Sequence, residues 1–374
     1  MNFQDILVAL MTCLDAASGA VLAAFYGFSL IPSGIGFLVG AIGVLAWGLK
    51  TPLSFQQEGI VLAGTLGTNK RERVSIIVGA AVLTGLIGIL GFPQAIVDSL
   101  GPGIFYGMLA GVGLYLARVA LNLAARNWLI GLPVLVVAIL VQLLTDNLVW
   151  AITASIPLGM LLGYLLKETP IKGELEKSGE EASNSDPSGA TPLNLPGVLG
   201  ELSFYRPSFL NWKVVRGLLA CSMLTLGGNI TYSAINAEIA GSAAHFNEVT
   251  ILSGVADLFS ALFGGASMEV IVSATAAAPH ATIAAFLFMA IFGILLLIGL
   301  VRKFARYVPL AATGGYLFVI GAMLSLPFNA ADAFAQGNPV VVAITMAVTA
   351  WIDPFTGMVA GVLVQAIMGW LGVL

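Results

Sequence analysis

Two glutamates lie inside apolar stretches of this sequence, and each follows residues that interrupt a helix. Glu269 comes shortly after the pair Gly264-Gly265, and Glu58 comes shortly after Pro52. When the two glutamates are aligned, the residues that follow them, Val-Ile-Val and Gly-Ile-Val, align as well. Broken, charged segments in corresponding halves of a membrane protein indicate the midplane binding site of a transporter. We therefore expect these two segments to build one site.

A carboxyl group inside a membrane segment is costly, and by default it marks a functional site. Because a carboxylate removed from water is more easily protonated, Glu269 could bind a proton together with the substrate and release it on the far side. We give Glu58 the same two roles, substrate binding and proton coupling, and we assign a further proton site to Asp15 in the first apolar stretch. The alternative is that these carboxyl groups only bond neighbouring helices.

Neutral polar residues near the two glutamates complete the predicted substrate site, because their side chains can both donate and accept hydrogen bonds. They are Asn229, Ser267, Ser273 and Gln57. For Thr231 and Tyr232 we favour hydrogen bonding between helices, and for Asp257 a structural role and a relay role stay open. Half-helices that begin after Pro52 and Gly265 would direct their positive ends at the midplane, which suits an anionic or electron-rich substrate.

We expect neither a metal nor a cofactor. His245 and His280 fall near segment ends without a metal-ligand partner, and Cys13 and Cys221 lie in apolar runs, where cysteine acts as a small hydrophobe. The sequence contains no HExxH, paired-histidine or nucleotide-binding fingerprint. We therefore expect no enzyme activity, and a membrane-embedded enzyme is the remote alternative.

The composition is that of a membrane protein. Hydrophobic residues make up 59% of the 374 residues, charged residues 9%, and the mean hydropathy is +0.99. A soluble domain carries about 25% charged residues. The 44 glycines suit closely packed membrane helices, and we find no basic patch suited to nucleic acid. We expect an all-α, multi-pass protein of the plasma (inner) membrane, in contact with lipid.

Apolar stretches of spanning length predict about fourteen transmembrane segments, of which the third and tenth are short and broken. They lie near 5–27, 31–49, 52–67, 72–91, 103–123, 128–144 and 148–166, and near 214–235, 248–263, 265–279, 281–301, 307–326, 338–351 and 354–373. The polar interval between the two sets has linker composition at its centre. We divide the chain into a first repeat (1–166), a partly disordered linker (167–213) and a second repeat (214–374).

The two halves share local patterns. Pro133-Val-Leu-Val-Val-Ala-Ile reappears as Pro339-Val-Val-Val-Ala-Ile, and Pro102…Gly107…Gly113 parallels Pro309…Gly314…Gly321. With seven segments in each half, the second half must enter the membrane from the opposite side. The sequence therefore predicts a 7+7 inverted repeat, the usual plan for alternating access.

Three stretches resemble the nucleobase–cation symporters, the xanthine/uracil permeases, and especially the adenine/guanine/hypoxanthine permeases. They are Ile96-Val-Asp-Ser-Leu-Gly-Pro-Gly-Ile-Phe-Tyr-Gly-Met-Leu-Ala-Gly-Val-Gly-Leu-Tyr, Phe259-Ser-Ala-Leu-Phe-Gly-Gly-Ala-Ser and Val308-Pro-Leu-Ala-Ala-Thr-Gly-Gly-Tyr-Leu-Phe-Val-Ile-Gly. The resemblance implies a core domain that holds the broken segments and moves against a gate domain. Two positions depart from the family pattern: Asn229 and Ser273 stand where carboxylates are expected, and Glu269 lies one helical turn before Ser273.

The resemblance implies proton-coupled symport of a nucleobase or a similar small planar solute. The alternative is a small-anion carrier of the sulfate or benzoate type on the same fold. The expected partners are the small-molecule substrate, a proton (with sodium as the alternative) and membrane lipid, and a homodimer stays open.

The distribution of basic residues predicts the orientation in the membrane. With the segments above, 14 of the 15 Lys and Arg residues, all except Lys50, fall on the side of the central linker. The positive-inside rule then places the linker in the cytoplasm and both termini outside, whereas the family resemblance implies both termini inside. We expect the charge rule to hold. Reporter fusions at Leu374 and within 180–190 test this: a cytoplasmic signal at the C-terminus with an external one in the linker would refute it.

Overall fold

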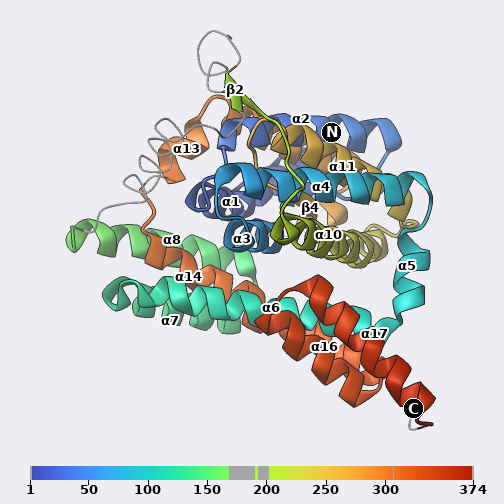
Figure 1. Cartoon of the computed structure of the whole chain (residues 1–374). Helices are drawn as coiled ribbons and strands as arrows, with labels where there is room; N and C mark the ends of the chain where they lie inside the picture. The colour runs from blue at the N-terminus through green and yellow to red at the C-terminus, as the bar shows by residue number, and fades with distance from the viewer. Residues whose placement is uncertain (1, 168–189, 193–201, 306, 373–374) are drawn as a thin grey trace. The chain divides into compact units, whose positions relative to one another are not determined.

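The computed structural model describes residues 2–167, 190–192, 202–305 and 307–372 (Figure 1). It divides into two compact units, and each unit takes segments from both predicted halves of the chain. Unit 1 comprises Met1–Pro93 and Thr169–Val308, and unit 2 comprises Gln94–Glu168 and Pro309–Leu374. Most of the predicted linker, including the stretch expected to be disordered, lies outside the described residues.

Unit 1 is a helical bundle around two broken segments. Its helices are α1 (Phe3–Phe25), α2 (Leu30–Trp47), α3 (Gln57–Leu66), α4 (Lys70–Ile89), α10 (Trp212–Ile239), α11 (Phe246–Ala261), α12 (Ala281–Leu297) and α13 (Leu300–Ala305). Helix α11 packs on α4 and α2, α12 packs on α2 and α1, and α10 packs on α4. Near one end of this bundle, β2 (Ala190–Pro192) pairs with β3 (Ser203–Tyr205).

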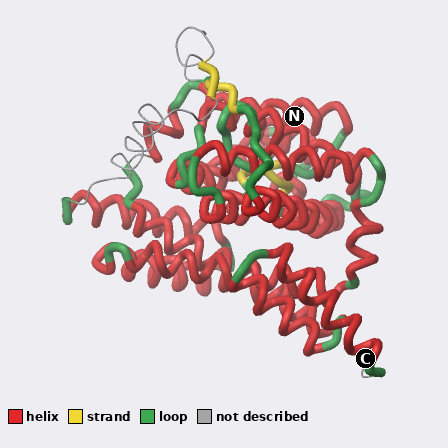
Figure 2. The backbone as a smooth tube through the Cα atoms, in the orientation of Figure 1, coloured by secondary structure: helices red, strands yellow, loops and turns green. Residues whose placement is uncertain are grey.

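The third segment is broken as the sequence predicts. Its first part is the strand β1 (Leu53–Phe55), and the half-helix α3 follows. Strand β1 pairs in antiparallel fashion with β4 (Met268–Val270) of the tenth segment, with Ser54 opposite Glu269. Figure 2 shows this short ladder in yellow among the helices of unit 1.

The tenth segment contains less helix than expected. After β4 comes a single 3₁₀ turn, η2 (Ala274–Ala277), in place of a half-helix. The hydroxyl group of Ser273 caps this turn by accepting a hydrogen bond from the backbone N–H of Thr275. Ala278 is extended because it precedes Pro279, and a residue before proline avoids the α conformation. The helix resumes only at α12.

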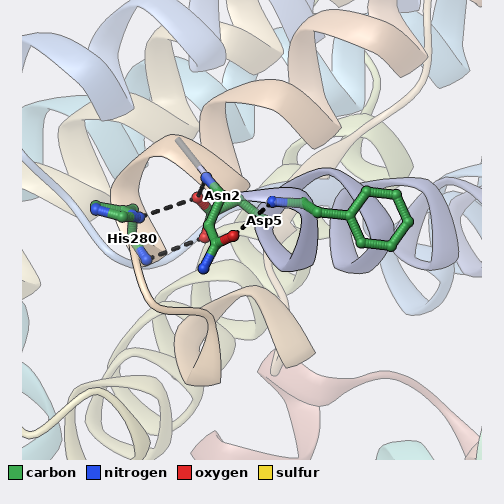
Figure 3. Close-up of polar contacts among 4 residues, drawn as sticks. Asn2, Asp5 and His280 are labelled. Atoms are coloured by element: carbon green, nitrogen blue, oxygen red, sulfur yellow. Dashed lines mark hydrogen bonds and ion pairs between the residues drawn. The ribbon is translucent and has the colours of Figure 1, made fainter.

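A carboxylate anchors the beginning of α1 to the connection between the tenth segment and α12 (Figure 3). Asp5 is fully buried, and its carboxylate accepts a hydrogen bond from the backbone N–H of His280 at 3.1 Å. The second oxygen lies 3.0 Å from Nδ1 of the same histidine. His280 is the N-cap residue of α12, and its side chain makes no capping bond, so Asp5 bonds one backbone N–H group at the beginning of this helix.

Unit 2 is built around α6. Its elements are α5 (Pro93–Leu100), α6 (Pro102–Ala125), α7 (Trp128–Thr145), α8 (Leu148–Leu165), α14 (Leu310–Phe318), the π-helical turn η3 (Val319–Ser325), α15 (Leu326–Gln336), α16 (Pro339–Trp351) and α17 (Pro354–Trp370). Elements α14, η3 and α15 form one continuous helix of 27 residues. The twelfth segment is therefore longer than the sequence predicts.

Seven helices of the described residues are long and apolar enough to cross a membrane, and four shorter apolar helices accompany them. Together with the short helices and broken segments they reproduce the predicted order of segments. Two glycines that the sequence analysis pairs as corresponding positions of the two repeats, Gly113 and Gly321, lie against each other in unit 2. A Cβ atom on Gly113 would lie 2.7 Å from the backbone oxygen of Gly321, so α6 and η3 touch through their backbones.

This crossing predicts that Gly113→Ala destabilises the protein by about 1–3 kcal/mol, because the added methyl group would overlap backbone atoms that cannot turn aside. We expect a lower melting temperature in detergent than for the wild type. Gly85→Ala is the matched control, because the nearest atom to its Cβ lies 4.0 Å away. Equal melting temperatures for the two variants would contradict the crossing.

Candidate functional site

The site is organised by the two edges of strand β4. Antiparallel pairing directs the backbone groups of Glu269 at β1, and the ladder is extended at both ends. Gln56 N–H donates to Ser267 O at 2.9 Å, and Ile271 N–H donates to Pro52 O at 3.3 Å. At membrane depth no water replaces a missing partner, so the opposite edge of the strand must be bonded by other groups.

Side chains from α10 and α11 bond that opposite edge. Asp257 accepts a hydrogen bond from the backbone N–H of Met268. Asn229 accepts one from Val270 N–H at 3.3 Å and donates to the hydroxyl group of Ser253 at 3.0 Å. Beyond the strand, Asn236 accepts from Ser273 N–H at 3.0 Å and donates to Ile271 O at 2.7 Å. Two side chains thus bond the strand edge in place of a third strand, and Asn236 continues this bonding along the backbone after β4.

The Glu269 side chain lies in a buried polar cluster. It is 4% exposed, and its Oε2 accepts a hydrogen bond from Gln56 Nε2 at 2.8 Å. The other end of the Gln56 amide, Oε1, accepts from the hydroxyl groups of Thr225 at 3.0 Å and Ser267 at 2.8 Å. Gly228 of α10 lies directly against the carboxylate, so a side chain at that position would displace it.

Glu58 lies at the beginning of α3, close enough to interact electrostatically with Glu269. The helix N-terminus supplies partial positive charge at this point. The side chain of the N-cap residue, Gln56, makes no capping hydrogen bond because it is directed at Glu269. The side chain of Gln56 therefore bonds none of the backbone N–H groups in the first turn of α3.

The structure brings together some of the predicted residues and separates others. Glu269, Asn229, Ser267 and Glu58 surround the ladder. Gln57 is directed away from it, because its Nε2 donates to Ser18 Oγ of α1 at 3.1 Å. Ser273 lies beyond the strand and caps η2. The side chain of Asp15 lies outside the described residues. Their roles toward a substrate or proton stay predictions.

Gln56, Thr225 and Asn236 were not predicted as site residues, although the sequence carries a signal for the two residues on α10. Thr225, Asn229, Tyr232 and Asn236 follow the spacing i, i+4, i+7, i+11, which places them on one face of α10. Gln56 meets Glu269 because Ser54 lies opposite Glu269 in the ladder and Gln56, two residues later in extended backbone, points to the same face. No group of three or more His, Cys, Asp or Glu side chains in the described ranges could hold a metal ion.

Comparison with known proteins gives no relative by sequence: no family model and no curated protein matches the chain. Solved structures do match. The transmembrane domain of a cyanobacterium bicarbonate transporter, BicA, is 15% identical, with a TM-score of 0.59 over 97% of this chain and 98% of that one. The murine anion transporter Slc26a9, in the inward-facing state, is 13% identical, with a TM-score of 0.66 over 98% of this chain and 69% of that one. A structure of SLC26A9 is 14% identical, with a TM-score of 0.64 over 97% of this chain and 64% of that one.

The fold is the one these anion transporters share. The chain is thus a multi-pass integral membrane protein with the 7+7 inverted repeat, the broken third and tenth segments and the core and gate domains that the sequence predicts. Unit 1 contains the broken segments and so corresponds to the predicted core domain, and unit 2 corresponds to the predicted gate domain.

The identification with the nucleobase–cation symporters is wrong, because the matching structures are anion transporters of the SLC26 type. The stretches that suggested it serve packing. Gly113 and Gly321 let α6 and η3 touch, and Gly314 lies against backbone atoms of Ala120 and Ala124. Gly265 lies against the backbone of Ser33 and Ser260. Glycines at such contacts are required by the fold and carry no information about the substrate.

We expect Asn229→Ala to lower the free energy of unfolding by about 1–3 kcal/mol, since it leaves the backbone N–H of Val270 without an acceptor. The measurement is the melting temperature in detergent. Asn247→Ala, an exposed amide on the neighbouring helix α11, is the control. An unchanged melting temperature for Asn229→Ala would show that the strand does not depend on this side chain.

Proposed function

We propose that the chain is a secondary active transporter of a small anion, and that Glu269 carries a proton coupled to its movement. The fold supports transport of an anion, because the matching structures include a bicarbonate transporter and SLC26 anion transporters. The composition and position of the buried cluster around Glu269 support the coupling.

One observation carries the proposal: the β1–β4 ladder places the N-terminus of α3 and the carboxyl group of Glu269 in the same polar cluster. A helix N-terminus attracts an anion through its partial positive charge and its N–H groups. A carboxyl group that exchanges a proton is the group required for coupling. Both lie in the broken segments, where carriers of this plan bind their substrates.

Electrostatic repulsion favours binding of the anion together with the proton. Two like charges 4 Å apart repel each other by about 4 kcal/mol at an effective dielectric constant of about 20. An anion at the beginning of α3 would meet this repulsion from an ionised Glu269, and Glu58 would add to it. Protonation of Glu269 removes its share, so the protonated site binds an anion more tightly. By linkage, the bound anion favours protonation to the same extent.

We expect anion-driven proton movement in proteoliposomes that contain the purified protein. An inward gradient of one anion class, tested among chloride, nitrate, sulfate, bicarbonate, acetate and benzoate, should acidify the lumen, as measured by a pH-sensitive dye. Glu269→Gln should abolish the proton movement while the melting temperature is kept, because glutamine still accepts a hydrogen bond from Gln56 but cannot titrate.

Glu238→Gln is the matched control, because Glu238 is an exposed carboxylate in the last turn of α10. It should behave as the wild type does. Proton movement with a neutral nucleobase and with no anion would overturn the anion assignment. Wild-type coupling in Glu269→Gln would overturn the role of that residue, and anion currents that depend on sodium alone would replace the proton with sodium.

A further inference from the structure

A second buried carboxyl group, Asp257, is joined to Glu269 by a continuous chain of hydrogen bonds. Asp257 is 1% exposed, and its Oδ2 lies 3.2 Å from Ser267 Oγ. Ser267 Oγ lies 2.8 Å from Gln56 Oε1, and Gln56 Nε2 lies 2.8 Å from Glu269 Oε2. Two small neutral side chains are therefore all that separates two carboxyl groups.

The hydroxyl group of Ser267 can donate only one hydrogen, yet it has two acceptors. When Asp257 is ionised, the serine donates to its carboxylate, and Gln56 Oε1 keeps only the hydrogen of Thr225. When Asp257 is protonated, the acid donates to Ser267 Oγ, and the serine turns to Gln56 Oε1. The charge of Asp257 therefore decides whether Gln56 Oε1 receives one hydrogen or two.

This switch acts on Glu269 through the amide of Gln56. A second donor on Oε1 polarises the amide and makes its N–H group a stronger donor, since hydrogen bonds in a chain reinforce one another. The stronger donor stabilises ionised Glu269. Coulomb repulsion acts in the same direction, because the two carboxyl groups interact electrostatically and one is more easily ionised when the other is neutral.

The position of the strand does not depend on this proton. Asp257 Oδ1 accepts from the backbone N–H of Met268, and Oδ2 alone faces the serine. Protonation at Oδ2 leaves the bond to the strand in place. Asparagine can reproduce the protonated state, since its oxygen would accept from Met268 N–H and its NH₂ group would donate to Ser267.

The surroundings of Asp257 leave Glu269 as its electrostatic partner. Helices α2, α4 and α10 and strand β4 pack against α11. Helix α2 has no charged residue, and the charged residues of α4 and α10 lie in their terminal turns. The titratable groups of these elements and of α11 itself are Lys70, Arg71, Glu72 and Arg73 on α4, Lys213, Arg216, Cys221, Tyr232 and Glu238 on α10, Glu248 on α11, and Glu269 on β4.

We propose that Asp257 is a second proton-binding site, and that Ser267 and Gln56 couple its protonation to that of Glu269. This inference rests on the proposed function for the role of Glu269 in transport. When a proton binds at Oδ2 of Asp257, the hydroxyl group of Ser267 turns from Asp257 to Gln56 Oε1 and keeps its own hydrogen. Glu269 then releases its proton more readily. The two carboxyl groups then titrate as a pair, in two steps that belong to both.

The test is a pH titration of purified protein, followed by the infrared absorption of protonated carboxyl groups, and it needs no substrate. The bands of Asp257 and Glu269 are identified by their loss in Asp257→Asn and in Glu269→Gln, because Asp5 and Asp353 are buried as well. Asp257→Asn should remove one band and move the titration of the other by about one pH unit or more. Glu269→Gln should shift the Asp257 band reciprocally. In Ser267→Ala both bands should remain. Removing one carboxyl group in this background should shift the titration of the other by less than it does in the wild type.

The inference is overturned if the Glu269 band titrates at the same pH in Asp257→Asn as in the wild type. Should Asp257→Asn fail to fold, Glu269→Gln decides in its place: an unmoved Asp257 band overturns the coupling. The proposed function is judged separately by the proteoliposomes. Coupled bands without anion-driven proton movement would refute the transport proposal alone, whereas proton movement with uncoupled bands would refute this inference alone.

Discussion

The structure depends on a demand of extended backbone inside a membrane: each N–H and C=O group of β1 and β4 must find a partner within the protein. Each strand supplies one edge for the other, which bonds half of these groups. The second edge of β4 is bonded by the side-chain oxygens of Asp257 and Asn229, and Asn236 bonds the extended backbone that follows the strand. The polar stripe of α10 and the aspartate of α11 exist in this apolar protein because the strand needs them.

The same demand explains why charge gathers here. Breaking a segment exposes a helix N-terminus, and bonding a strand edge brings in acceptor side chains, so positive and negative electrostatic potential arise together. An unbroken pair of helices would satisfy its own backbone and provide neither. The site is therefore a consequence of the interruption of the third and tenth segments. This accounts for a buried polar cluster in a protein in which only 9% of the residues are charged.

The sequence predicts the broken segments because their signals are local. Pro52 and Gly264-Gly265 interrupt helices whatever surrounds them, and a glutamate in an apolar run is conspicuous. It does not decide between Gln56 and Gln57, which are adjacent and chemically identical, because the β1–β4 register determines which of them meets Glu269. The tenth segment was expected to contain more helix than the single turn before Pro279.

The family resemblance failed for a related reason. Glycine and proline patterns in α6 and α14 reflect how closely the helices approach one another. Transporters of unrelated substrates can share this packing requirement. Side chains that distinguish substrates are few, and they lie in segments whose pairing the sequence leaves open. The order of segments and the interruption of the third and tenth could therefore be predicted, whereas the hydrogen-bond partners within the candidate site and the class of substrate could not.

The pairing of β1 with β4 also has a consequence for how the protein is made. Gln56 and Glu269 are separated by 213 positions in the chain. At a synthesis rate of about 5–20 residues per second, β1 leaves the ribosome about ten to forty seconds before its partner exists. During that interval its backbone and Glu58 have no strand beside them. The third segment must wait at the membrane surface, or in the shelter of the insertion machinery, until the second half of the chain arrives.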